Sequence, residues 1–265
     1  MKPLAVPLFR THLFASPLKS KSQNPSTFRF RFSSIRSQSM DSASVVDSKS
    51  ENKLGVFDRL FLDLFRSKMV QEVGWDSKKP GYDGLVEVAN WLVVKSRTNA
   101  ETVETAVRIL RSLFPPLLLE LYKMLVAPIG NGKLAAIMVA RVTALTCQWL
   151  MGRCVTYSVD FPDGSPCESG VFVERCKYLE ESKCAGICIN TCKLPTQAFF
   201  KDYMGVPLVM EPNFSDYSCQ FKFGLLPSEA SEDEILRQPC LEICPNANRR
   251  RELKGNYDET QCPKV

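Results

Sequence analysis

The sequence predicts an α+β protein, with a mainly helical N-terminal half packed on a small, cysteine-rich α+β C-terminal half. Apolar residues recur at three- and four-residue steps between residues 54 and 152, which is the period of an amphipathic helix. After Gly152 the pattern changes to short alternating runs bounded by turn residues, which is typical of strands. With 265 residues, 45% of them hydrophobic, the chain can bury a sizeable core.

Breaks in the apolar pattern divide the first half into five helices. Gly74 ends the first helix, and Asp83 and Asn99 are candidate N-caps of the next two. Pro115 and Pro116 end the third helix, and the second of these prolines can open the fourth. The predicted helices cover residues 54–73, 83–95, 100–113, 117–126 and 134–151, with a glycine-containing turn at 129–133.

The segment 134–151 is the longest apolar run, and its length would just permit a membrane span. Arg141 lies at its centre, where a charged side chain costs about 2.5–3.5 kcal/mol on insertion scales. We therefore expect a buried or membrane-contacting helix, with a true span as the alternative.

The apolar pattern and turn residues of the second half predict a hairpin, a helix and two further strands. The hairpin pairs residues 155–160 with 171–174 around the turn sequence FPDGS. Residues 193–204 contain a short helix that Pro195 opens and Gly205 ends. The other strands cover 206–210 and 218–223, before an acidic loop at 228–234. We expect a helical region at 54–152, a cysteine-rich domain at 153–245 and a mobile tail at 246–265.

The charge of the chain is concentrated in its first 40 residues. The net charge is +5, and seven of the 34 basic residues lie in 1–40, where there is no Asp or Glu; 27 basic and 29 acidic residues remain. A basic, serine-rich, acid-free leader is typical of an organelle transit peptide. We expect a plastid transit peptide over 1–40 and a polar linker over 41–53. The near-neutral remainder gives no reason to expect a nucleic-acid partner.

Seven of the 11 cysteines are grouped in the second half. Residues four apart share one face of a helix, so the CxxxCxxxC series would form a stripe of thiols. Thiolates are preferred ligands of zinc, iron and iron–sulfur clusters. Cross-linking by disulfides and burial as unligated small hydrophobes are the alternatives. The candidate metal ligands, of which we expect a subset to bind, are Cys176, Cys184, Cys188, Cys192, Cys219, Cys240 and Cys244.

The only histidine is His12, inside the predicted leader. A mature chain without histidine has no proximal-His haem, no two-His-one-carboxylate iron site and no Ser-His-Asp triad. Any metal must be held by Cys, Asp, Glu, Asn, Tyr or backbone groups. No catalytic or substrate-binding residue can be named from the sequence.

Three segments carry a resemblance to a known family. VERCKYLEESKCAGICINTCKLPTQ, GVPLVMEPNFSDYSCQFKFG and RQPCLEIC resemble the Dwarf-twenty-seven family of plastid β-carotene isomerases over about residues 171–245. The resemblance implies a chloroplast enzyme with an iron cofactor, located in the stroma or at a membrane surface. It also implies interconversion of all-trans- and 9-cis-β-carotene at the 9,10 double bond, which feeds strigolactone or other apocarotenoid hormone synthesis. A non-catalytic iron–sulfur or zinc protein and a thiol redox protein are the alternatives.

A carotenoid substrate requires an apolar binding site and a group that assists the rotation about a double bond. The substrate is long and apolar, so we expect a deep apolar site and peripheral contact with plastid membrane lipid. Isomerisation breaks a π bond of the polyene transiently. A Cys-ligated iron centre could assist this step by transferring an electron. A thiolate could assist it instead by adding to the double bond and leaving again. The sequence does not decide between these two mechanisms.

Overall fold

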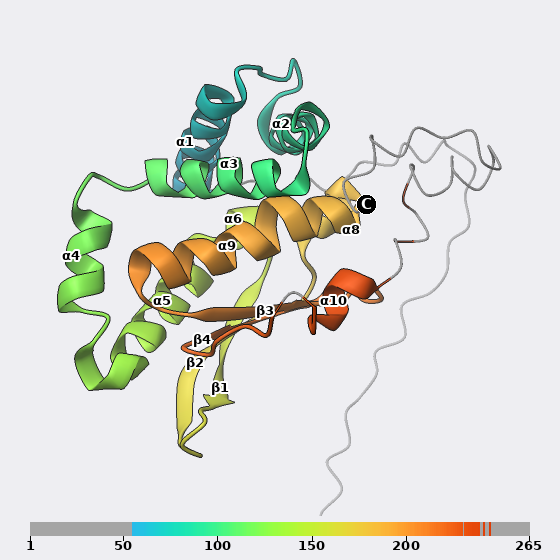
Figure 1. Cartoon of the computed structure of the whole chain (residues 1–265). Coiled ribbons are helices and arrows are strands. Elements are labelled where there is room, and N and C mark those ends of the chain that lie inside the picture. The colour runs from blue at the N-terminus through green and yellow to red at the C-terminus, as the bar shows by residue number, and fades with distance from the viewer. Residues whose placement is uncertain (1–54, 230, 239–240, 242–243, 245–265) are drawn as a thin grey trace, which may run out of the picture. The chain divides into compact units, whose positions relative to one another are not determined.

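A computed structural model gives the fold and describes residues 55–229, 231–238, 241 and 244. Figure 1 shows helices α1, α2 and α3 on one side of a helical run that contains α8 and α9, and a four-stranded sheet on the other side. Helix α5 packs on strands β1, β2 and β4. The predicted α+β class is confirmed, with the helical layer from the first half and the sheet from the second.

The first half folds into the predicted helices, with small shifts at their ends. Helix α2 begins at Gly81 rather than Asp83. The Thr98 hydroxyl, not Asn99, caps α3 by accepting a hydrogen bond from Glu101 N at 3.1 Å. The elements are α1 (Val56–Val73), α2 (Gly81–Lys95), α3 (Asn99–Ser112), α4 (Leu118–Leu125), the 3₁₀ turn η1 (Ile129–Gly132), α5 (Lys133–Thr146) and α6 (Gln148–Met151).

The prediction of one continuous helix over 134–151 is wrong, because the chain bends at Cys147 (φ −106°, ψ 8°). The Thr146 hydroxyl and the Gln148 amide each donate at 2.8 Å to a carbonyl four residues back, in competition with the backbone. Within the described part of the chain, no single helix is long and apolar enough to cross a membrane. Helix α4 and the segment Ile129–Thr146 pass that test only as a pair, bent by 110°.

The sheet contains the predicted hairpin and the two further strands, all antiparallel in the order β1-β2-β4-β3. Direct partners lie on one face of a sheet, and Cys154, Val173 and Cys219 are such a row. Val171, Phe221 and Met210 form the next buried row on the same face. The strands are β1 (Cys154–Asp160), β2 (Pro166–Val173), β3 (Leu208–Pro212) and β4 (Cys219–Phe223).

The helix predicted over 193–204 is part of a longer helical run that begins at Ala185. Pro195 lies inside this run, where a proline supplies no N–H to the helix. The backbone widens before it, and Leu194 N donates to Ile189 O, five residues back. The run comprises α8 (Ala185–Ile187), the π-helical η2 (Cys188–Lys193), α9 (Leu194–Phe199) and the π-helical η3 (Phe200–Met204), and the unpredicted α7 (Lys177–Ser182) precedes it.

One buried core joins both halves of the described chain. It contains Leu62 of α1, Val88 of α2 and Ala140 of α5 together with side chains from every strand. Leu241 and Cys244, which follow the short helix α10 (Glu234–Arg237), are buried in the same cluster. The boundary between the regions 54–152 and 153–245 stays a prediction, as do the leader, the linker and the tail, which lie outside the described residues.

Candidate active site

The structure places the grouped cysteines at the ends of neighbouring elements. Cys176 and Cys184 precede α7 and α8, whereas Cys188 and Cys192 lie in η2 and Cys219 begins β4. All are buried except Cys192, which is half-buried. Among the described residues, Cys176, Cys188, Cys192, Cys219 and Cys244 are free thiols, as are Cys147, Cys154 and Cys167 outside this group. Cys244 is buried in the core, and Cys240 lies outside the described residues.

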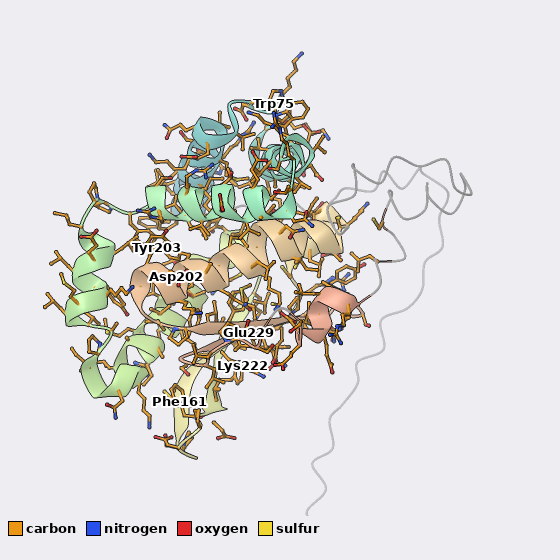
Figure 2. The ribbon with its side chains drawn as sticks, in the orientation of Figure 1. Trp75, Phe161, Asp202, Tyr203, Lys222 and Glu229 are labelled. Atoms are coloured by element: carbon orange, nitrogen blue, oxygen red, sulfur yellow. The ribbon has the colours of Figure 1, made fainter. Side chains whose placement is uncertain are left out.

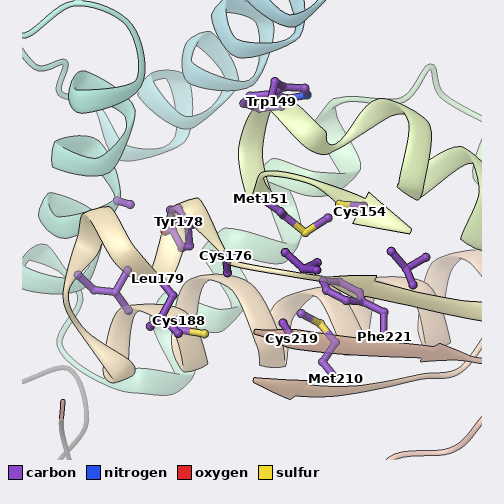
Figure 3. Close-up of a cluster of buried hydrophobic side chains, with 14 of the residues drawn as sticks. Trp149, Met151, Cys154, Cys176, Tyr178, Leu179, Cys188, Met210, Cys219 and Phe221 are labelled. Atoms are coloured by element: carbon purple, nitrogen blue, oxygen red, sulfur yellow. The ribbon is translucent and has the colours of Figure 1, made fainter. Parts of the chain in front are cut away.

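Four of these thiols, Cys176, Cys188, Cys192 and Cys219, lie close enough to influence one another's charge. Figure 3 shows three of them, Cys176, Cys188 and Cys219, in the buried cluster. Burial raises the pKa of Cys188 and of Cys219 well above the ordinary value, and it raises the pKa of Cys192 to about 12. Neighbouring thiols add to each rise, while the Lys193 ammonium opposes it at Cys188 and Cys219. These groups are therefore neutral thiols at physiological pH.

Cys147 and Cys154, which the four-residue cysteine spacing did not select, also lie in this region. Burial raises the pKa of Cys154 to about 12, and the neighbouring Cys147 and Cys176 add to that rise. Cys154 lies in the same sheet row as Cys219, with Val173 between them. The four-residue spacing does not include Cys154. Only an alignment of the strands 154–160 and 166–173 could have placed Cys154 beside the grouped cysteines from the sequence.

The described thiols do not form a ready metal site. Nowhere in the described part of the chain do three or more His, Cys, Asp or Glu side chains gather closely enough to hold a metal ion. The described residues alone do not form a Cys-ligated iron centre, and Cys240 lies outside them, so no chemical step is assigned to one.

A small apolar cavity of about 70 Å³ opens beside Cys192, where helices α1, α3 and α6 meet α7 and η2. Its lining contains no charged side chain. The residues around it are Phe65, Met69, Leu92, Ala106, Ile109, Leu110, Leu150, Met151, Tyr178, Thr191, Cys192 and Thr196. Binding pockets usually measure about 300–1,000 Å³, so the side chains of this wall must move apart for a large ligand.

The polar atoms of this cavity are few and have partners. The Tyr178 hydroxyl lies 2.6 Å from Thr191 Oγ1, and Thr191 donates to the Ile187 carbonyl at 2.8 Å. Tyr178 is therefore the donor to Thr191. Burial raises the pKa of Tyr178, so it stays protonated. The Thr196 hydroxyl is hydrogen-bonded to Cys192, which leaves one neutral thiol and one neutral phenol in an apolar wall.

The position of α7 in this wall is fixed by Tyr82 and Lys177. Tyr82 of α2 donates to the Leu150 carbonyl at 2.7 Å, and the Lys177 ammonium lies 4.0 Å from the centre of the Tyr82 ring. Phe65 packs edge-on against Trp149 at 5.8 Å between ring centres. The wall therefore combines α1, α2 and α6 with the segment that carries Tyr178.

A second cavity of about 330 Å³ differs in character. Lys193, Glu211, Glu232, Asp233 and Glu234 are among the residues that line it. Lys193 is buried and forms an ion pair with Asp233, which ties α10 to η2. The charged lining does not suit a hydrocarbon, whereas the cavity beside Cys192 has no charged side chain in its lining.

The fold and the cavity define a cysteine-rich α+β protein with an uncharged, apolar pocket. Residues 149–232 match the family described as "Beta-carotene isomerase D27-like, C-terminal". Two relatives carry the name "Beta-carotene isomerase D27, chloroplastic". The Medicago truncatula protein is 33% identical over 206 residues, covering 78% of this chain and 77% of the relative. The Arabidopsis thaliana protein is 32% identical over 216 residues, covering 79% and 76%.

The chain belongs to the β-carotene isomerase D27 family, which confirms the resemblance noted in the sequence. No solved structure matches it significantly. The matched segment contains Tyr178, Thr191 and Cys192, so the polar atoms of the cavity come from the part that defines the family. Sequence reasoning missed Tyr178 and Thr191, because neither has a diagnostic spacing.

Proposed function

We propose that the protein interconverts all-trans- and 9-cis-β-carotene, or a related carotenoid, at the 9,10 double bond in the cavity beside Cys192. Its family membership makes it an isomerase of the chloroplast, as the names of both relatives state. The observation that carries the proposal is the uncharged apolar lining around one neutral thiol and one neutral phenol. A polyene hydrocarbon offers no group that a charged side chain could bind.

The chain's own residues supply a dry, shaped wall and two hydrogen donors. Phe65, Ile109 and Leu150 exclude water along the hydrocarbon chain. The S–H of Cys192 and the hydroxyl of Tyr178 remain protonated, so the cavity holds no resident anion. Of the two mechanisms that the sequence left open, reversible thiolate addition by Cys192 has to overcome a pKa of about 12.

Iron dependence is a separate part of the proposal, and it rests on the family resemblance alone. Iron would supply one-electron chemistry when bound. Anaerobically purified full-length protein should contain iron if the proposal holds, and metal analysis after gel filtration measures it. Protein that isomerises β-carotene without stoichiometric metal would remove iron from the proposal. The link of a 9-cis product to strigolactone or other apocarotenoid hormone synthesis has the same basis.

Expression in carotene-accumulating bacteria, with chromatographic separation of the pigment isomers, tests the function. Wild-type protein should shift the ratio of 9-cis to all-trans β-carotene. Cys192→Ala should reduce the shift strongly, whereas Cys167→Ala should not, since Cys167 is a buried cysteine in β2 that does not line the cavity. An unchanged isomer ratio with soluble, folded wild-type protein would refute the proposal.

The two alternative functions fit the thiols less well. A thiol redox protein needs accessible cysteines of low pKa. Cys188 and Cys219 are buried, and their pKa values are raised. A non-catalytic metal-binding protein would be expected to gather its ligands, and the described residues contain no such group.

The proposal includes peripheral contact with membrane lipid, because a carotenoid dissolves in the bilayer rather than in water. The predicted transit peptide, residues 1–40, lies outside the described residues and stays a prediction. A fusion of residues 1–50 to a fluorescent protein should enter plastids in plant cells, and cytosolic fluorescence would contradict it.

A further inference from the structure

Helix α4 buries none of its side chains, although it lies in a protein with a well-packed core. Leu121, Met124 and Leu125 are 48%, 65% and 65% exposed. The helix is attached mainly to η3, where the Lys123 ammonium donates to the Asp202 carbonyl at 2.6 Å. In Figure 1, α4 stands at the edge of the molecule, and Figure 2 labels Asp202 at the end of the run that faces it.

Further exposed apolar side chains follow α4 in the turn and in α5. Ile129 in the connecting turn and Met138 and Val142 of α5 are 48%, 44% and 57% exposed. These two residues of α5 are four apart, so they form one outer stripe. We call Leu121, Met124, Leu125, Ile129, Met138 and Val142 the α4–α5 surface. Single exposed apolar residues are ordinary, but six of them on two successive helices and the turn between them indicate an interaction site.

Left-handed backbone directly precedes α4 and recurs in the turn η1 that follows it. Leu117, the residue before the helix, has φ 69° and is 66% exposed. A leucine with positive φ is uncommon, because its Cβ crowds the backbone. Gly130, Asn131 and Gly132, after the helix, also have positive φ. Leu117 therefore combines an unfavourable backbone conformation with an apolar side chain that is exposed to solvent.

We propose that the α4–α5 surface enters one leaflet of a lipid bilayer with anionic headgroups. The proposal rests on the proposed function, since its substrate would reside in that bilayer. The bend of 110° and the length of each helix suit insertion into one leaflet rather than a crossing. Between residues 117 and 146 the charged side chains are Glu120, Lys123, Lys133 and Arg141, with a net charge of +2.

Arg141 supplies the contact with the headgroups. It is exposed next to Val142 and has no hydrogen bond or ion pair with any described residue. Its aliphatic stem can lie along the apolar stripe while the guanidinium reaches the lipid phosphates. A second copy of this chain would bring the same positive charge to the contact, so a bilayer is favoured over self-association.

Leu145, at the end of α5, is also exposed, at 78%. The helix breaks at Cys147, and after the break the buried Trp149 ring packs against Phe65, which lines the cavity beside Cys192. The chain therefore passes from the exposed end of α5 to a neighbour of the cavity wall.

Flotation with phosphatidylcholine vesicles, with and without phosphatidylglycerol, tests this surface. The full chain should bind, and the double change Leu121→Glu with Leu125→Glu should weaken binding at least about tenfold. Leu226→Glu is the matched control, because Leu226 is 70% exposed in the loop after β4 and its replacement should leave binding unchanged.

Arg141→Gln tests the electrostatic part of the contact. It should weaken binding about fivefold, and only to vesicles that contain phosphatidylglycerol. Arg97→Gln, at an exposed arginine in the α2–α3 loop, controls for net charge.

Activity in detergent micelles separates this proposal from the proposed function. The double variant should isomerise β-carotene in micelles at the wild-type rate and lose activity on carotene in vesicles. Wild-type protein that floats but never isomerises would refute the function and leave the surface intact. Equal flotation of the double variant and wild type would overturn the surface. So would a wild-type dimer that the double variant converts to a monomer, because the surface would then bind a second copy.

Discussion

Helix α4 and the π-helical segment η2 reverse the usual relation between polarity and burial. In α4, Leu125 and Met124 are both 65% exposed, whereas in η2 the lysine Lys193 is 2% exposed and Asn190 is 3% exposed. The difference shows that burial follows from the available partners rather than from residue type alone. Lys193 can be buried because Asp233 and Gln197 face its ammonium. The leucines of α4 have no such covering in the described chain.

Removing one member of the buried pair should produce the largest effect on stability. Lys193→Met leaves Asp233 buried without its cation, and we expect a loss of roughly 3 kcal/mol in the free energy of unfolding. Urea denaturation measures it. Lys222→Met is the control, because its ion pair with Glu211 is more exposed, at 27% and 43%, and should contribute less than about 1 kcal/mol. Equal losses in the two variants would show that η2 is not specially dependent on its buried charge.

Filling the cavity should reduce activity more than stability. Ala106→Leu adds three carbons to the apolar wall, and we expect at least about a tenfold fall in isomerisation with a stability change of about 1–3 kcal/mol. Chromatographic analysis of the isomers in micelles measures the activity. Ala100→Leu, at an exposed position on the same helix, should leave activity unchanged. Full activity in the filled variant would place the substrate elsewhere.

The buried thiols should make stability depend on pH in alkaline solution. The folded-state pKa of Cys154 is about 12, and the unfolded thiol has a pKa of about 8.5. Its contribution is therefore complete below about pH 8.5 and is lost as the pH rises towards 12. Denaturation between pH 8 and 11 should show a steeper decline for wild type than for Cys154→Ala. Parallel curves would mean that this thiol is accessible to solvent.

The smallest expected effect concerns the strained residue before α4. Leu117→Gly relieves the positive φ, and we expect stability to rise by a few tenths to about 1 kcal/mol. Vesicle binding should fall slightly at the same time, because an exposed apolar side chain is lost. Thermal unfolding and flotation measure the two changes. A loss of stability would show that Leu117 packs within the protein.

The sequence predicted the helices and strands well where periodicity and turn residues agree, as around Gly74 and the FPDGS turn. It failed at Cys147, where side-chain hydrogen bonds bend the helix. It placed Pro195 correctly in the first turn of α9, but it missed the widened helical segment η2 that runs directly into α9. Both failures arise from backbone adjustments that residue type does not encode.

The candidate site was predicted only in part. The four-residue spacing correctly grouped Cys188 with Cys192, because both lie in one helical segment. It gave no indication of the apolar cavity, which combines Phe65 and Ile109 with Tyr178 from far along the chain. Such a cavity depends on how α1, α3 and α7 pack, and no local pattern specifies that packing. Whether any of the seven cysteines binds a metal stays a prediction.

The core that joins Leu62 to Cys244 also bears on how the protein tolerates shortening. Leu62 lies in the first described helix and Cys244 is the last described residue, so both ends of the described chain contribute to one buried cluster. A chain cut inside these limits would expose apolar side chains that the intact protein buries. We therefore expect a truncation within 55–244 to destabilise the whole described region rather than to release a stable part of it.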